Sequence, residues 1–153
     1  MDKLIKEIMK ALVIFDTNYG NTKLVADSIA GQLGEGARSV SVKDLRDSDL
    51  AGIGLLVVGS PIIGWKPSER MGNFLAGLSK GRLKGMKAAA FDTRVKMFIS
   101  GDAAKKISRA LNNFGAEIIV RPQAFYVRGK EGPLLDGEIE RAKDWARSIR
   151  TKI

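Results

Sequence analysis

The sequence predicts an α/β fold in which a five-stranded parallel sheet lies between two layers of helices. Short apolar runs alternate along the chain with segments of helical period, as expected of successive strand–helix–strand units. The length of 153 residues, 44% of them hydrophobic, suits one compact domain with one core, so we expect a single domain over residues 1–153. Right-handed crossover connections would place helices on both faces of the sheet.

Five short apolar runs are the predicted strands. They are Ala11–Phe15, Ser39–Val42, Ile53–Val58, Ala88–Phe91 and Glu117–Val120. No change of composition marks a linker between them, and the sequence has no internal repeat. The pattern of apolar runs does not by itself fix the order of the strands in the sheet.

The segments between and after the strands carry apolar residues at helical spacing. This spacing predicts helices over Lys23–Leu33, Ala104–Phe114 and Asp136–Ile149. A further helix should begin after Ser68, a good N-cap residue, and end near Leu78.

The composition excludes several kinds of redox centre. The chain has no cysteine and no histidine, which removes disulfides, thiolate-ligated zinc or iron–sulfur clusters, and histidine-ligated haem. It also removes the commonest general acid and base. Any redox chemistry must therefore belong to an organic cofactor, and no metal site is predicted.

The net charge of +9 is unevenly distributed along the chain. Met1–Ala76 holds nine Lys/Arg and nine Asp/Glu, whereas Gly77–Ile153 holds seventeen and eight. The excess is either a solvated surface or a docking face for an acidic partner or an anionic membrane surface. Nucleic acid ranks below both, because no basic run is interleaved with aromatic residues and no known nucleic-acid-binding signature occurs.

The ends and apolar stretches of the sequence predict a cytoplasmic protein without a transmembrane segment. The opening MDKLIKEIMK mixes charged and apolar residues, unlike the core of a signal peptide. The longest apolar stretch, around Gly52–Gly59, is too short to cross a bilayer. The sequence makes no prediction about the oligomeric state.

A polar loop follows the first predicted strand and leads directly into a helix. It reads Asp16-Thr17-Asn18-Tyr19-Gly20-Asn21-Thr22. Backbone N–H groups at the start of a helix point outward at the positive end of the helix dipole, so they can hold a phosphate group without a lysine. Gly20 would allow a close approach to such a group. The alternative interpretation is an ordinary polar loop with an N-cap.

Two other phosphate-binding motifs are absent from the sequence. The P-loop motif requires Gly-Lys-Ser/Thr, which does not occur. The dinucleotide motif GxGxxG is also missing, because Gly31, Gly34 and Gly36 have the wrong spacing and lie at a helix end. A nucleoside triphosphate or NAD is therefore disfavoured as a tightly held cofactor.

The segment Thr17-x-Tyr19-Gly20-Asn21-Thr22 resembles the phosphate loop of the flavodoxin family, usually Ser/Thr-x-Thr-Gly-x-Thr directly after the first strand. Tyr19 departs from the commonest pattern, although the related quinone-reductase branch often has tyrosine there. The resemblance extends over essentially the whole chain and implies a flavodoxin-like sheet of order 2-1-3-4-5. It also implies FMN bound non-covalently beyond the carboxyl ends of the strands. The implied phosphate-binding residues are Thr17, Asn18, Tyr19, Gly20, Asn21 and Thr22.

The segment Gly59–Pro67 follows the third predicted strand and is expected to form the second loop around the flavin. Its candidate binding residues are Ser60, Pro61, Ile62, Gly64 and Trp65. Trp65 is the best candidate to cover the flavin ring, because a flat aromatic side chain can stack on the ring and exclude water. Alternatively, Trp65 closes the core and Ile62 or Ile63 covers the ring. Trp145, beside a helical apolar stripe, is expected to pack in the core.

The third loop, Asp92-Thr93-Arg94-Val95-Lys96, resembles the segment that reaches the pyrimidine side of the flavin in flavodoxins. Asp92, Thr93 and Arg94 are its candidate binding residues. Low-potential members of the family surround the flavin with acidic residues, whereas this loop carries Arg94 and Lys96. A cation near the ring would make the potential for the second electron less negative. Alternatively, both basic side chains point to solvent and are screened by salt.

Three functions are compatible with these features. The first is an FMN-binding electron carrier that serves redox partner proteins, which needs no catalytic side chain and tolerates the absence of histidine. The second is an FMN-dependent enzyme resembling NAD(P)H:quinone or protoporphyrinogen oxidoreductases. The third is a non-redox binding module on the same fold, because fold does not guarantee function.

Overall fold

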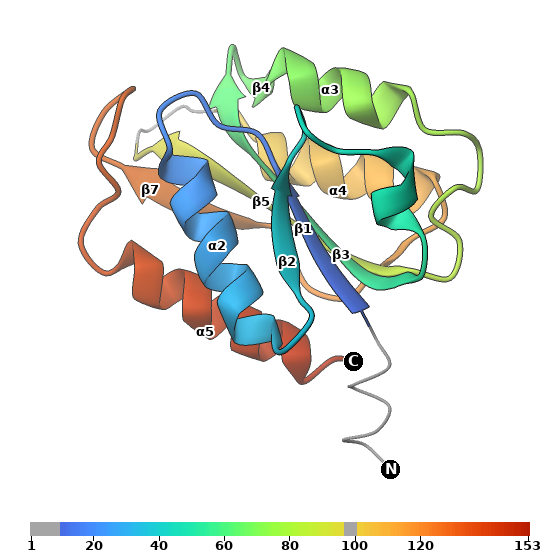
Figure 1. Ribbon diagram of the computed structural model, residues 1–153. Helices are drawn as coiled ribbons and strands as arrows, with labels where there is room; N and C mark the ends of the chain where they lie inside the picture. The colour runs from blue at the N-terminus through green and yellow to red at the C-terminus, as the bar shows by residue number, and fades with distance from the viewer. Residues whose placement is uncertain (1–9, 97–100) are drawn as a thin grey trace.

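The chain folds into a parallel sheet whose strand order follows the predicted pattern. The computed structural model in Figure 1 describes residues 10–96 and 101–153. The main strands are β1 (Lys10–Phe15), β2 (Arg38–Ser41), β3 (Ile53–Ile63), β5 (Lys87–Val95) and β6 (Glu117–Ile118). They are arranged in the order β2-β1-β3-β5-β6, and each neighbouring pair is parallel. Counted along these five strands, the order is the expected 2-1-3-4-5.

Helices cover both faces of the sheet, which confirms the three-layer prediction (Figure 1). Helices α2 (Asn21–Leu33) and α5 (Glu138–Arg150) pack on one face. Helices α3 (Glu69–Ala76) and α4 (Ala103–Asn113) pack on the other, together with the short 3-10 helix η1 (Asp47–Leu50). Each of these α-helices begins and ends within three residues of its predicted bounds.

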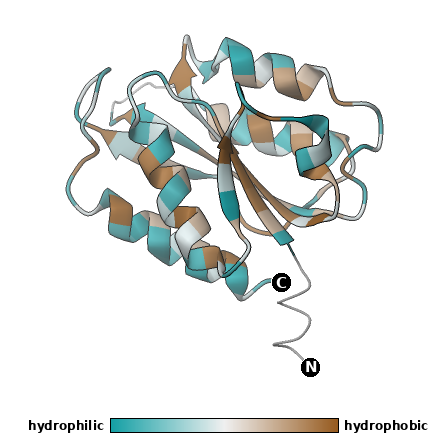
Figure 2. Cartoon of the chain, in the orientation of Figure 1, coloured by the Kyte–Doolittle hydropathy of each residue, from teal (hydrophilic) through white to brown (hydrophobic). Residues whose placement is uncertain are grey.

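The core consists of two apolar clusters separated by the sheet. Along β1, Val13 belongs to the cluster under α2 and α5, whereas Leu12 and Ile14 belong to the cluster under α3 and α4. A strand covered on both faces is apolar at successive positions, and Figure 2 shows the central strands as largely hydrophobic. Trp145 packs edge-to-face against Phe91 and Phe125 at 6.0 Å between ring centroids, as its sequence position predicted.

Strands β3 and β5 extend further than the sequence predicted. Ser60 and Pro61 continue β3, while Asp92, Thr93 and Arg94 continue β5, so these residues lie in strands rather than in loops. The two strands keep pairing beyond Gly59, with Ser60 opposite Asp92 and Pro61 opposite Thr93. Pro61 is tolerated because the pairing of β3 with β1 ends at Gly59, so Pro61 itself has no partner in β1.

Within residues 10–96 and 101–153, the sheet has seven strands rather than five. Strand β4 (Lys66–Pro67) turns back antiparallel to the end of β3. The predicted strand Glu117–Val120 is shorter than expected, because β6 ends at Ile118. Strand β7 (Gln123–Val127), which lies beyond the predicted bounds, resumes the pairing with β5. Pro122 lies in this interruption, where it has no N–H to donate to the ladder and restricts Arg121 before it.

No helix in residues 10–96 and 101–153 is long and apolar enough to span a membrane. Residues 1–9, which contributed to the expectation about a signal peptide, lie outside the described residues.

Candidate functional site

A cleft of about 560 Å³ opens where the carboxyl ends of β1, β3 and β5 meet. Its lining consists of Thr17, Asn18, Tyr19, Asn21, Thr22, Pro61, Ile62, Ile63, Gly64, Thr93, Arg94, Val95, Val127 and Lys130. The chain leaves β1 and β3 toward opposite faces of the sheet, since α2 and α3 cover different faces. Ligands of open α/β sheets bind in the crevice at such a switch point.

The cleft brings together residues from all three predicted binding segments. The predicted residues in its lining are Thr17, Asn18, Tyr19, Asn21, Thr22, Pro61, Ile62, Gly64, Thr93 and Arg94. Gly20, Ser60, Asp92 and Trp65 do not line it. Ser60 and Asp92 are fully buried and support the cleft from behind.

The loop between β1 and α2 has the geometry of an anion-binding helix start. Gly20 is the N-cap of α2 and has a φ of 92°, a left-handed conformation that favours glycine. Its backbone N–H donates to Oγ1 of Thr17 at 2.8 Å. Because that oxygen already accepts a hydrogen bond, the hydroxyl proton of Thr17 can be donated to a group in the cleft.

Two contacts hold this loop against distant parts of the chain. The hydroxyl groups of Thr22 and Thr93 lie 2.8 Å apart and are both buried, which joins the start of α2 to β5. The side-chain amide of Asn21 donates to the backbone oxygen of Glu131 at 3.2 Å. The second contact brings the segment after β7 over the cleft, where Lys130 contributes to the lining.

Lys130 was not among the residues predicted from the sequence. Its segment joins β7 to α5, and a Cβ at Gly132 would lie only 2.5 Å from Oδ1 of Asn21, so the two segments pack closely. Gly132 has a φ of 99°, which also favours glycine. The sequence could have shown only that the connection between β7 and α5 is long. The length of a connection does not indicate which other loop it contacts.

The turn between β3 and β4 carries Trp65. Gly64 and Trp65 have φ values of 57° and 72°, so both residues of this two-residue turn are left-handed, as tight hairpins require. The Trp65 side chain is 55% exposed, and Ile62, Ile63 and Gly64 form this wall of the cleft. A role for Trp65 over a bound ring remains a prediction.

The third segment contains a buried ion pair. The carboxylate of Asp92 accepts hydrogen bonds from Nε and Nη2 of Arg94 at 2.9 and 2.6 Å and from the backbone N–H of Ala104 at 2.8 Å. Burial raises the pKa of Asp92, although its hydrogen bond with Arg94 opposes the rise. The hydrogen bond with Asp92 raises the pKa of Arg94.

The sequence led us to expect positive charge from Arg94 and Lys96 near the cleft, and the contacts of Arg94 reduce its share of that charge. Nη2 of Arg94 also lies 3.4 Å from Oδ1 of Asp102, so two carboxylates offset its charge. Lys96, the second cation of the segment, is exposed, and its Nζ lies 5.6 Å from the ring centre of Tyr126.

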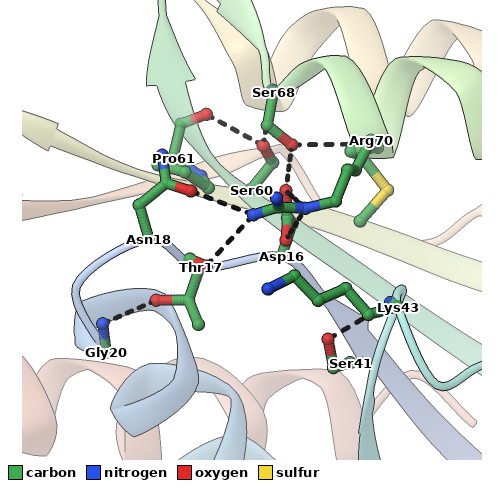
Figure 3. Close-up of polar contacts among 11 residues, drawn as sticks. Asp16, Thr17, Asn18, Gly20, Ser41, Lys43, Ser60, Pro61, Ser68 and Arg70 are labelled. Carbon is green, nitrogen blue, oxygen red and sulfur yellow. Dashed lines mark hydrogen bonds and ion pairs between the residues drawn. The ribbon is translucent and has the colours of Figure 1, made fainter.

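A second buried carboxylate lies behind the loop that follows β1. Asp16 has no exposed surface and accepts hydrogen bonds from Oγ of Ser68 at 2.6 Å and from Nε of Arg70 at 2.9 Å (Figure 3). Ser68 is also the N-cap of α3, as predicted, because its Oγ accepts from the N–H of Met71. The role of Arg70 was not predicted, and its distance of 54 residues from Asp16 in the sequence gave no signal.

The donors and surfaces of the cleft fit a phosphate monoester attached to a flat ring. The helix start, Thr17 and Asn18 offer donors at one end. Apolar side chains form much of the rest of the lining: Pro61, Ile62, Ile63, Val95 and Val127. Within the described residues, no cluster of acidic side chains is arranged to hold a metal ion.

This sheet order, with an anion-binding helix start beside a polar and apolar cleft, defines a mononucleotide-binding α/β protein. The family model described as flavodoxin matches residues 13–145. The chain therefore belongs to the flavodoxin family, whose members bind FMN.

Comparisons with individual proteins show similarity in sequence and in fold. The chain is 29% identical to coenzyme F420H2 oxidase from Methanothermobacter marburgensis over 92% of its own length, but it spans only 36% of the length of that relative. Its fold is similar to that of oxidised flavodoxin 1 from Bacillus cereus, with a TM-score of 0.78, 21% identity, and coverage of 94% of this chain and 99% of the other. A flavodoxin from the domain Archaea gives a TM-score of 0.79 at 21% identity, with coverage of 94% and 98%.

Proposed function

We propose that this chain binds FMN in the cleft and carries electrons between other proteins. The observation that supports this most strongly is the cleft itself, in which a helix start with free donors lies beside an apolar wall. Bound FMN would supply the one- and two-electron redox chemistry, while the chain binds the cofactor, orients it and excludes water. The lining contains no carboxylate among the described residues, which suits electron transfer better than proton-transfer catalysis.

The two ends of the cleft would have different tasks. Thr17, Asn18 and the backbone N–H groups at the start of α2 would bind the phosphate. Ile62, Thr93 and Arg94 would lie along the ring. Residues behind the lining would support these contacts, since Oγ of Ser60 donates to the backbone oxygen of Pro61 and Asp92 holds Arg94.

The surface around the cleft suits an acidic redox partner. We call this surface the cleft rim and define it by Tyr19, Ile63, Trp65, Lys96, Lys106 and Lys130. The first three side chains are between 44% and 55% exposed, and the three lysines are also exposed. Nζ of Lys106 lies 3.4 Å from the backbone oxygen of Trp65, which places a cation beside an exposed aromatic residue. Exposed apolar residues and lysines near the same cleft match a partner that offers both apolar and acidic side chains.

Turnover experiments test the proposal that the chain is a carrier. FMN-loaded protein is mixed with NAD(P)H and a quinone, with and without a separate flavodoxin reductase. A carrier transfers electrons only when the reductase is present, whereas an enzyme of the quinone-reductase type turns over alone. Turnover without a reductase would contradict the carrier function.

Charge reversal tests the acidic partner separately. Lys106→Glu and Lys130→Glu should slow electron transfer from the reductase and weaken its salt dependence, because steering by the cleft rim is lost. Lys152→Glu is the matched control, because Lys152 is exposed and lies beyond the carboxyl end of α5. If electron transfer from the reductase is equally fast in Lys106→Glu, Lys130→Glu and Lys152→Glu, docking at the cleft rim is contradicted.

The similarity to coenzyme F420H2 oxidase supports a second candidate function. The chain matches 36% of that relative, so it would correspond to one part of a larger oxidase. In this case the chain takes electrons from reduced coenzyme F420 and passes them to an oxidase component. Reduction of the FMN-loaded protein by F420H2, faster than by a reductase with NADPH, would favour this candidate. A single-domain chain and a cytoplasmic location also remain proposals.

A further inference from the structure

The buried carboxylate of Asp16 connects the phosphate loop to helix α3. Oδ1 and Oδ2 of Asp16 lie 2.9 and 3.1 Å from Nε of Arg70, and Oδ2 also accepts from Ser68 at 2.6 Å. Ser68 is in turn fixed through its backbone N–H, which donates to Oγ of Ser60 at 2.9 Å. Figure 3 shows these residues converging from β1, β3 and the first turn of α3. The guanidinium group of Arg70 is thereby held in one place beside the loop.

From this place, Arg70 reaches two residues of the phosphate loop. Its Nη2 donates to Oδ1 of Asn18 at 2.9 Å and lies 3.4 Å from the backbone oxygen of Thr17. A guanidinium group has only donors, so the side-chain atom of Asn18 that faces it must be the oxygen. Figure 3 shows the amide nitrogen of Asn18 on the side away from Arg70.

The orientation of Asn18 decides what the cleft offers to an anion. Asn18 is exposed and lines the cleft, and in this orientation its NH2 group is free to donate there. An amide rotated by 180° would turn its carbonyl oxygen toward a phosphate, where two acceptors repel each other. Arg70 favours the donor orientation, because only that orientation lets Asn18 accept from the guanidinium group.

We propose that Arg70 is a positioning residue that presents the Asn18 amide as a phosphate donor and so makes the cleft select phosphorylated flavins. The inference rests on the proposed binding of FMN in this cleft. Arg70 acts through Asn18 rather than as a direct ligand, because its own charge is paired with Asp16 and the cleft lining does not include it. Its loss should therefore affect FMN more than riboflavin, which lacks the phosphate.

Lys43 provides a control that separates the orientation of Asn18 by Arg70 from a general effect of positive charge near the loop. Lys43 and Arg70 line the same groove of about 420 Å³ on the outer side of the loop, between the end of β2 and α3. Within the described residues, the side chain of Lys43 has no hydrogen bond to the phosphate loop, and its backbone N–H donates to Ser41. Removal of either cation changes the charge of this groove equally, but only Arg70 orients Asn18.

The experiment compares dissociation constants for FMN and riboflavin, measured by flavin fluorescence with purified apo-protein. Arg70→Gln should weaken FMN binding by about tenfold to a hundredfold, the range for losing one hydrogen bond to a charged group. Riboflavin binding and both constants of Lys43→Gln should stay within about twofold of the wild type. Arg70→Lys should behave like Arg70→Gln, because an ammonium group lacks the fork that spans Asp16 and Asn18.

Asn18→Ala keeps the experiment decisive if Arg70→Gln fails to fold, because this change leaves the pair of Asp16 and Arg70 intact. It should reproduce the selective loss of FMN binding. In the double variant Arg70→Gln/Asn18→Ala, the two losses should not add, because both remove the same donor. Equal losses for FMN and riboflavin, additive losses, or a Lys43→Gln effect as large as that of Arg70→Gln would overturn the inference. A wild-type protein that does not bind FMN would overturn the proposed function as well.

Discussion

The carboxylate of Asp16 and the guanidinium group of Arg70 form an ion pair in which the acid is buried and the base is not. Oδ1 of Asp16 lies 2.9 Å from Nε of Arg70, and the two side chains are 1% and 43% exposed. A buried carboxylate that loses its partner is left with an uncompensated charge, whereas a half-exposed arginine can return to water. The loss of Arg70 should therefore destabilise the fold more than the loss of Asp16.

Replacement of each partner in turn tests this asymmetry. Arg70→Gln leaves the buried carboxylate of Asp16 without its cation, so it should lower the free energy of unfolding by about 1–3 kcal/mol, and by more than Asp16→Asn does. Urea unfolding followed by circular dichroism measures the change. Asp47→Asn is the control, because Asp47 is 92% exposed in its ion pair with Arg82 and its loss should leave the unfolding midpoint unchanged. A shift for Arg70→Gln no larger than that for Asp16→Asn would contradict the account.

The close approach of Gly59 and Phe91 gives a second prediction about stability. A Cβ at Gly59 would clash with the Cζ end of the ring of the fully buried Phe91, which belongs to the core under α2 and α5. Gly59→Ala should therefore lower the free energy of unfolding by about 2 kcal/mol or more. Gly72→Ala should instead raise it by about 0.5–1 kcal/mol, because Gly72 lies inside α3 with open space around it. A tolerated Gly59→Ala would mean that Phe91 does not occupy this position.

The pH dependence of stability tests the environment of Asp92. Burial raises the pKa of Asp92 in the folded protein above the ordinary value of 3.8, so the folded state holds more protons than the unfolded state just above pH 3.8. The contribution of Asp92 to stability should therefore fall as the pH rises through this range. Urea unfolding of wild type and Asp92→Asn at a series of pH values measures their difference in stability. If the stability of the wild type relative to Asp92→Asn instead increases as the pH rises, the pKa of Asp92 is lowered in the folded protein.

Trp65 combines an unfavourable backbone conformation with a predicted role over the flavin ring. Its φ of 72° is unfavourable for a bulky residue, so Trp65→Gly should stabilise the apo-protein by about 1 kcal/mol. Trp65→Ala removes the indole without relieving the backbone and should not stabilise it. Both variants should weaken FMN binding equally if the indole covers the ring. Unchanged binding in both would assign that task to Ile62 or Ile63.

Local patterns in the sequence were sufficient for most of the fold. Helical spacing placed α2 and α5 because their apolar residues repeat along one face, and an N-cap residue, Ser68, placed the start of α3. The ends of the strands were less predictable. Polar residues such as Ser60 and Asp92 indicate a loop when considered alone, but their pairing across the sheet keeps them in strands. That pairing depends on neighbours far along the chain.

The candidate site also combines residues that local patterns predict with residues that only contacts between distant segments bring together. The predicted phosphate-binding residues, Thr17 to Thr22, are continuous in sequence, so they were predicted together, and most of them line the cleft. Arg70 and Lys130 reach the site through contacts between distant segments, which no local pattern records. The charge of Arg94 was visible in the sequence, but its partner Asp92 was interpreted only as a binding residue. The structure adds that the two form a buried pair.

The most direct test of the account is a titration of purified apo-protein with FMN, followed by quenching of flavin fluorescence. The account predicts one site with a dissociation constant below about 1 μM, and a loss of at least about tenfold in Thr17→Ala/Thr22→Ala, which removes hydroxyl groups of the phosphate loop. An absence of quenching at FMN concentrations of about 10–50 μM, in a protein that is folded by circular dichroism, would contradict FMN binding in this cleft.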